Sequence, residues 1–246
     1  MRFQHIVFAM FVMILSHKHR FIFLKTRKTA GTSIELGLCN FCGKEDIITQ
    51  EGIKDEALRK SLGYIGPQNN TVNIFKHRLV EIARIPIQGF ANHKRHDPGW
   101  LVKKHIGNEI FDSYHKITAI RNPWDMAVSR FYFRRQLIGS EVNENTTFKE
   151  YLRITPKNDL DNSRVYRINE KSVVDSYVRF ENLLEDWKGL LNKLNLDYID
   201  LPKAKTGIRK DKEHYSLLYD DDDIEIIRNL CTWEINEFGY EFEDYR

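Results

Sequence analysis

Apolar and polar positions along this 246-residue chain form short blocks that predict strands alternating with helices. Apolar runs at residues 21–24 and 117–120 are typical of buried strands, and a further strand is predicted within 173–180. Helical patterns, each following one of these runs or a polar loop, are expected from residue 32 onward and at 54–62, 122–135, 183–194 and 221–230.

Two dipeptides predict where helices begin. Asp97-Pro98 places a capping side chain before a proline suited to the first helical turn, and Gly107 is a suitable end for that helix. Asn122-Pro123 repeats the signal after the strand at 117–120. Residues 84–90 contain a weaker strand candidate, which Pro86 restricts to a sheet edge.

The alternation of strands and helices predicts an α/β fold with a central, mostly parallel sheet covered by helices on both faces. Ligands of such sheets bind beyond the carboxyl ends of the strands. The length suits one domain, which we place at residues 16–246.

The segment before that domain, residues 1–15, is expected to be an N-terminal extension. Its apolar part, residues 6–15, resembles the hydrophobic region of a signal peptide, but no cleavage site of small residues follows it. A membrane-spanning helix needs about 20 apolar residues, so no stable membrane span is expected.

Composition indicates a soluble globular protein, with 41% hydrophobic and 30% charged residues. The net charge of +3 suits anionic small ligands and does not indicate nucleic-acid binding. Cys39 and Cys42 have C-x-x-C spacing, but no second pair of ligands accompanies them, and with Cys231 they are interpreted as structural or incidental thiols. This cysteine usage favours the reducing cytoplasm.

The most informative segment is residues 25–33, KTRKTAGTS. A strand, a loop with Lys28 and Gly31, and the hydroxyls of Thr32 and Ser33 at a helix start form an arrangement that binds phosphate. The nucleotide-triphosphate loop requires lysine directly after its last glycine, whereas Lys28 precedes Gly31 by three residues. The pattern therefore departs from that of an NTPase.

A second segment, residues 121–129, reads RNPWDMAVS and also follows a predicted strand. Together the two segments resemble the donor-binding motifs of sulfotransferases that use 3′-phosphoadenosine 5′-phosphosulfate (PAPS), most closely the carbohydrate sulfotransferases. The first is similar to the 5′-phosphosulfate loop, and Arg121 and Ser129 match the 3′-phosphate motif. The resemblance extends over about residues 16–242 and implies the P-loop-like sulfotransferase architecture.

The resemblance also implies roles for individual residues. Backbone N–H groups of residues 30–33 would hold the 5′-phosphate, and Lys28 would place its ammonium on the oxygen that bridges phosphorus and sulfur, where negative charge develops. Arg209 and Lys210, in the basic loop 203–212, would reach the donor phosphates. No metal is required. The implied donor-binding set is Lys28, Thr29, Ala30, Gly31, Thr32, Ser33, Arg121, Ser129, Arg209 and Lys210.

His96 is the candidate catalytic base, because it fits a family pattern in which a histidine stands eleven residues before the glycine of G-x-E-[IV]-[FW]-D, here Gly107 to Asp112. The positive end of the helix that follows would lower its pKa and favour the neutral form. His93, His105 and Asp97 are alternatives.

One residue departs from the family pattern: Arg27 stands where proline usually precedes the lysine. Its side chain would either touch the phosphosulfate or point to solvent, and we expect it to point to solvent. The predicted function is transfer of a sulfuryl group from PAPS to a hydroxyl acceptor, which is expected to be a glycan or glycoconjugate. The alternatives are a nucleotide kinase or NTPase on a related fold and a non-enzymatic module that binds polyanions through its basic clusters.

Overall fold

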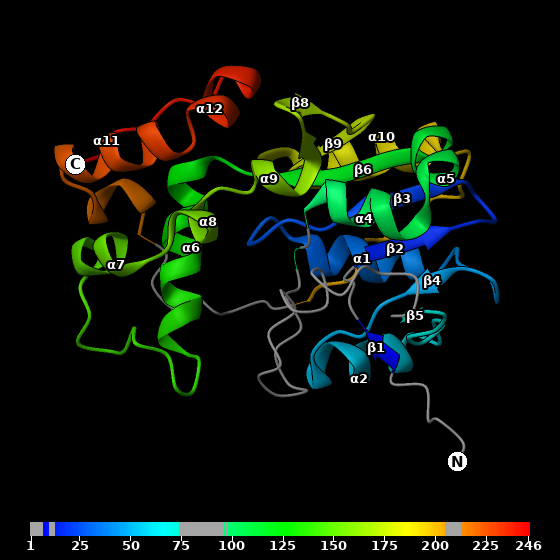
Figure 1. The fold of residues 1–246 in the computed structure, drawn as a ribbon. Coiled ribbons are helices and arrows are strands. Elements are labelled where there is room, and N and C mark those ends of the chain that lie inside the picture. The colour runs from blue at the N-terminus through cyan, green and yellow to red at the C-terminus, as the bar shows by residue number, and fades with distance from the viewer. Residues whose placement is uncertain (1–6, 10–12, 74–95, 97, 205–212) are drawn as a thin grey trace, which may run out of the picture.

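A five-stranded sheet organises the protein, as the computed structural model in Figure 1 shows. The structure describes residues 7–9, 13–73, 96, 98–204 and 213–246. The strand order is β4 (Ile47–Ile48), β2 (Met13–Ser16), β3 (Phe21–Leu24), β6 (His115–Ile120) and β9 (Ser176–Arg179). The pairs β3–β6 and β6–β9 are parallel, whereas β2 is antiparallel to β3 and β4.

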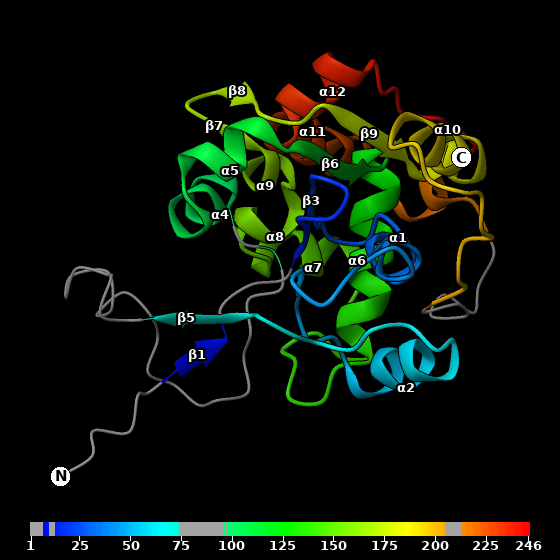
Figure 2. The ribbon, with the colours of Figure 1, turned by 90° about the vertical axis from the view of Figure 1, so that its right-hand side faces the viewer.

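Alternate residues of β3 belong to two different cores, because successive side chains of a strand point to opposite faces. Phe21 and Phe23 pack with α1 (Gly31–Cys39) and α10 (Leu183–Lys193). Ile22 and Leu24 pack in a second core with residues from the helices on the opposite face. Those helices include α4 (Gly99–Ile106), α5 (Asn108–Ser113) and α9 (Ser163–Tyr166), and Figure 2 shows α4 and α5 across the sheet from α1 and α10.

A third core lies beyond the carboxyl end of β6, where α6 (Pro123–Arg135) begins. Its buried aromatic residues come from α6, from α7 (Phe148–Ile154), and from the short 3-10 helix η3 (Tyr215–Leu218) and Tyr219 directly after it. α11 (Asp221–Leu230) adds Ile224 and Ile227. Figure 1 shows these helices gathered to one side of the sheet. The start of α6 is fixed because the Asn122 side chain accepts a hydrogen bond from the Trp124 amide.

The smaller elements lie around these layers. α2 (Ile53–Ser61) follows β4, and β1 (Val7–Ala9) pairs with β5 (Thr71–Asn73) in a separate antiparallel sheet. α8 (Lys157–Leu160) precedes α9, and β7 (Arg167–Ile168) pairs with β8 (Lys171–Ser172). The 3-10 helix η2 (Phe180–Asn182) links β9 to α10, and α12 (Thr232–Phe238) closes the chain's helical part.

The sheet with helices on both faces confirms the predicted fold class, and the strand at 21–24 and the helix at 221–230 have the predicted bounds. The strand predicted at 173–180 is shorter, because only Ser176–Arg179 pairs with β6. Pro98 is the residue before α4 and not its first helical residue. The strand candidate at 84–90 lies outside the described residues.

The sequence pattern missed β2. The boundary expected after residue 15 falls inside this strand, whose residues Ile14 and Leu15 are fully buried. Its backbone hydrogen bonds are made with β3, across the turn at residues 17–20. A local sequence pattern does not reveal this partner. Among the described residues, no helix has the length and apolarity needed to cross a bilayer.

Candidate active site

The loop between β3 and α1 has a strained backbone. Lys28 and Ala30 both have φ of 60°, the left-handed region that non-glycine residues rarely occupy. Such strain costs about 1–3 kcal/mol per residue and is concentrated at functional sites. The first hydrogen bond of α1 runs from the Ile34 amide to the Ala30 carbonyl over 3.2 Å. The amides of residues 31–33 therefore precede the helical ladder and are directed outward, as in anion-binding helix starts.

Gly31 allows this loop to turn closely over the end of β3. A Cβ atom at Gly31 would lie 3.0 Å from the Cγ of Lys25 and 3.3 Å from the carbonyl oxygen of Thr26. Both contacts are tighter than ordinary van der Waals packing, so a larger residue would push the loop away from the strand. Gly31 is thus needed for the close approach of the loop backbone to β3. The positive φ values of the loop belong to Lys28 and Ala30.

Lys28 has its ammonium above an aromatic ring, with Nζ 4.6 Å from the centroid of Phe133 on α6. Its carbonyl oxygen accepts a hydrogen bond from Nη1 of Arg121 over 2.9 Å. The two predicted motifs are thus in direct contact, although 93 residues separate them. Sequence reasoning did not identify Phe133.

The hydroxyls of the loop differ in what they contact. Thr29 is fully buried and hydrogen-bonded to the Thr26 hydroxyl, which donates in turn to the Ala119 carbonyl. Thr29 therefore anchors the loop to β6. Ser33 Oγ accepts a hydrogen bond from the Ala204 amide over 3.1 Å.

That bond brings the start of the basic loop 203–212 to the N-terminus of α1. Arg209 and Lys210 themselves lie outside the described residues. Thr32, one residue before Ser33, is buried at the same helix start.

Arg121 follows β6 and is held from three sides. Its Nε and Nη2 lie 2.8 and 2.7 Å from Oδ2 of Asp125, and its guanidinium carbon lies 3.7 Å from the Phe180 ring centroid. A guanidinium has five N–H groups. Two of them point to Asp125 and a third donates to the Lys28 carbonyl. Among the described residues this leaves two N–H groups for a phosphate. Ser129 lies one helical turn beyond Asp125 on α6 and is partly buried.

His96 lies beside the loop between β3 and α1, with Nδ1 3.0 Å from the carbonyl oxygen of Lys25. A carbonyl only accepts, so Nδ1 carries the proton and Nε2 carries the lone pair in the neutral ring. Burial and the nearby charge of Arg27 hold the pKa of His96 well below its ordinary value. The pKa is lowered, as predicted, and burial is the largest cause.

The alternatives to His96 are less well defined. His105 lies in the last turn of α4. His93 and Asp97 lie outside the described residues.

The prediction for Arg27 is wrong. Its side chain is buried instead of pointing to solvent, and only 8% of the residue is exposed. Nη1 donates to the Asn158 carbonyl over 3.0 Å, and Nη2 lies 3.7 Å from Asp159. The backbone amide of Arg27 donates to Oδ1 of Asn162 over 2.9 Å. The charge of Arg27 can be buried because the Asn158 carbonyl and the Asp159 carboxylate face it. These partners are distant in the sequence, so no local pattern predicts them.

Behind the loop lies a network of buried charges. Lys25 Nζ is 2.6 Å from Glu35 and 2.5 Å from Glu51, and Arg59 on α2 reaches the second oxygen of Glu35 over 3.1 Å. Burial raises the pKa of Glu35 to about 7, against the attraction of Lys25. These groups are paired with one another inside the fold and fix the loop's base to α1 and α2.

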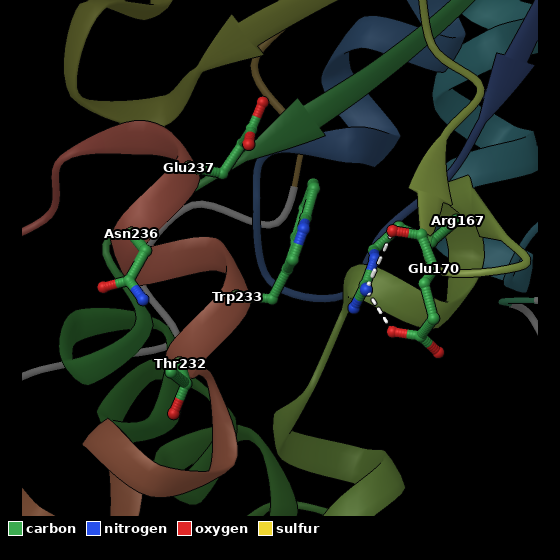
Figure 3. Close-up of a pocket in the computed structure, with 6 residues that line it drawn as sticks. All are labelled: Arg167, Glu170, Thr232, Trp233, Asn236 and Glu237. Carbon is green, nitrogen blue, oxygen red and sulfur yellow. Dashed lines mark hydrogen bonds and ion pairs between the residues drawn. The ribbon is translucent and has the colours of Figure 1, made fainter.

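Figure 3 shows a shallow pocket elsewhere, of about 420 Å³, between α12 and the β7–β8 hairpin. Arg167 lies with its guanidinium carbon 4.3 Å from the Trp233 ring centroid and pairs with Glu170. Cation and carboxylate neutralise each other, so the pocket does not indicate an anion site. Its lining residues, none of them predicted as site residues, are Arg167, Glu170, Thr232, Trp233, Asn236 and Glu237.

Other candidate chemistry is absent from the described part of the chain. There, no three His, Cys, Asp or Glu side chains gather as metal ligands. The three cysteines are buried thiols, which agrees with their interpretation as structural, and burial raises the pKa of Cys39 to about 12.

Comparison with known proteins bears on the fold and on the family of this chain. The crystal structure of mouse sulfotransferase SULT7A1 complexed with PAP has the same fold, with a TM-score of 0.50 and 16% identity over 90% of this chain and 86% of that one. An uncharacterized protein of Archaeoglobus fulgidus is 30% identical over 102 residues, 40% of this chain and 82% of its own length. A model of the sulfotransferase family matches residues 12–241, and the chain therefore belongs to the sulfotransferase family.

Proposed function

We propose that this sulfotransferase takes its sulfuryl group from PAPS and transfers it to a hydroxyl of a glycan or glycoconjugate. The observation that carries the proposal is the hydrogen bond from Arg121 to the Lys28 carbonyl. It joins a lysine-containing loop and an arginine motif at the carboxyl ends of the neighbouring parallel strands β3 and β6, where ligands of such sheets bind.

The residues present fit a donor with two separated phosphate groups. The outward amides of residues 31–33 suit the 5′ end, and two N–H groups of Arg121 with Ser129 suit the 3′-phosphate. Arg209 and Lys210 are proposed to close over it from the loop that begins beside Ser33. PAPS supplies the transferable sulfuryl group when bound, and the chain supplies the charges and the base.

In the proposed reaction, an acceptor oxygen forms a bond to sulfur while the bond from sulfur to the bridging oxygen breaks. The acceptor proton passes to Nε2 of His96, whose neutral form is favoured by burial. The Lys28 ammonium stabilises the charge left on the bridging oxygen of the departing 3′-phosphoadenosine 5′-phosphate (PAP). The sulfuryl group thus passes to the acceptor, the proton to His96 and the negative charge to PAP, and no further reactant is needed.

Membership of the sulfotransferase family does not favour the kinase and polyanion-binding alternatives. We also propose that the protein acts in the cytoplasm, because its three cysteines are buried thiols and not disulfides. The division into an extension and one catalytic domain remains a prediction, with the boundary moved ahead of β2.

The test of the donor is thermal-shift titration of the full chain with PAP, ATP and AMP. PAP should raise the melting temperature at lower concentration than ATP or AMP, because it alone carries both a 3′- and a 5′-phosphate. A larger shift with ATP and magnesium would contradict the proposal. For the acceptor, transfer of labelled sulfate should favour glycans over simple phenols, and a preference for phenols would restrict the proposal to the donor.

The base is tested by His96→Ala. Turnover should fall by about 10²–10⁴-fold, the usual contribution of general base catalysis, while PAP affinity changes little. His105→Ala is the matched control and should retain turnover. Full activity of the His96 variant would remove His96 from the mechanism.

A further inference from the structure

Asn162 holds the backbone directly before Lys28 through both ends of its side-chain amide. Its Oδ1 accepts a hydrogen bond from the Arg27 amide, and its Nδ2 donates to the Arg27 carbonyl, each over 2.9 Å. The side chain thus contacts Arg27 as a neighbouring strand would. Asn162 is 4% exposed and lies between α8 and α9, 135 residues away along the chain.

The pair of hydrogen bonds from Asn162 requires a residue other than proline at position 27, because proline has no backbone N–H to donate. The side chain of Arg27 adds a second attachment to the same segment, through the Asn158 carbonyl and Asp159. Asp159 is itself paired with Arg130 of α6 over 3.0 Å. The segment 158–162 therefore connects the loop to the helix that carries the second motif.

Asn162 is supported from behind by a buried carboxylate. The Tyr166 hydroxyl donates to the carboxylate of Glu234 on α12, and the backbone of Asn162 acts to lower the pKa of the same carboxyl group. Glu234 is 5% exposed, and burial raises its pKa to about 8. These contacts limit the directions in which Asn162 can move relative to the loop.

Lys28 is consequently held on both sides. Asn162 fixes the residue before it, and Arg121 binds its carbonyl over 2.9 Å. Between these contacts the backbone of Lys28 has φ of 60°, a conformation that an isolated lysine avoids. Removing one contact allows the residue to relax and carries Nζ away from its position over α6.

We propose that Asn162 is a positioning residue for sulfuryl transfer, which holds the strained Lys28 backbone so that its ammonium meets the donor's bridging oxygen. The proposal rests on the function proposed above for Lys28. A displacement of about 1 Å at a reacting group can cost 10²-fold in rate, so the expected loss lies in kcat more than in donor binding.

The test compares Asn162→Asp, Asn162→Ala and a control, Asn192→Asp on α10, from pH 5.5 to 8.5. In Asn162→Asp, an ionised carboxylate would keep the bond from the Arg27 amide but repel the Arg27 carbonyl, whereas a protonated carboxyl group would donate to that carbonyl. The kcat of Asn162→Asp relative to wild type should therefore rise as pH falls. Asn162→Ala should lose roughly 10–100-fold in kcat at every pH, with a smaller change in the Kd for PAP.

Asn192→Asp makes the same substitution on an exposed side chain of α10, away from the loop, and should follow the wild-type profile. A ratio for Asn162→Asp that does not change with pH would overturn the proposal, as would kcat of Asn162→Ala within twofold of wild type. Asn162→Asp keeps the size of the side chain and the hydrogen bond from the Arg27 amide. It therefore tests the positioning role of Asn162 even where the alanine variant does not fold. Absence of PAPS turnover in the wild type would instead refute the proposed function.

Discussion

Lys25 and Lys28 stand three residues apart in one loop, yet their surroundings differ completely. Lys25 is 4% exposed and pairs with two buried carboxylates. Although burial opposes the charge, Glu35 and Glu51 raise the pKa of Lys25. Lys28 is more exposed, has a strained backbone and places its ammonium on an aromatic ring.

The difference separates a lysine that is bound by two buried carboxylates from the lysine that we propose to act on the donor. The charge of Lys25 is matched within the protein, so it fastens the back of the loop to α1 and the segment before α2. The front of the loop instead combines backbone strain, outward amides and a lysine over α6. Strain of this kind persists only where the surrounding structure enforces it.

The largest expected effect is that of Lys28→Ala. Turnover should fall by about 10³-fold, because removal of one donor to the developing charge typically costs 10²–10³-fold. The melting temperature should stay close to that of the wild type. The measurement is sulfate transfer from PAPS with melting curves, and Lys188→Ala, an exposed lysine on α10, is the control. An equal loss of turnover in Lys28→Ala and Lys188→Ala would contradict a specific role for Lys28.

Lys25→Met should show the opposite behaviour. Loss of the cation leaves Glu51 and Glu35 buried beside each other, and breaking a buried ion pair typically costs about 3–5 kcal/mol of unfolding free energy. Urea denaturation measures this loss. The double variant Lys25→Met with Glu51→Gln should lose less than the two single variants together, since it removes both charges of the Lys25–Glu51 pair and leaves neither unpaired. Unchanged stability in Lys25→Met would contradict the structural role.

Arg121→Ala extends the comparison to the second motif. The preference for PAP over AMP should fall by about 10–100-fold, the equivalent of hydrogen bonds to a charged group worth 1.5–3 kcal/mol. Calorimetric titration of both nucleotides gives the ratio. Arg179→Ala, which removes an exposed cation at the end of β9, should keep the wild-type ratio. Discrimination that survives in Arg121→Ala would mean that another group binds the 3′-phosphate.

The smallest expected effect concerns Arg27 and His96. Burial and then the charge of Arg27 lower the pKa of His96, so removal of that charge in Arg27→Ala should raise it. Protonation would then remove the base at higher pH, and the acid limb of kcat/KM should move upward in pH. Arg27→Lys keeps the charge and should show a smaller movement. A limb that moves downward in Arg27→Ala would exclude His96 as the titrating group.

Local signals predicted much of the fold because they depend on short segments. The apolar run of β3 and the Asn122-Pro123 start of α6 are confirmed with their bounds. The strand β2 was missed, because its burial depends on a neighbour and not on its own pattern. Arg27 was wrongly assigned to solvent for the same reason, since its partners lie more than 130 residues away.

The sequence by itself determined the order of the two motifs, the lysine that precedes its glycine and the strands that both follow, because phosphate binding at a helix start is a local geometry. Only the tertiary structure decided that Lys25 lies between two buried carboxylates while Lys28 lies over the ring of Phe133, and that Asn162 binds the backbone of Arg27. Those outcomes depend on which distant groups share a buried space, and the burial of a polar group is tolerated only where such partners meet it.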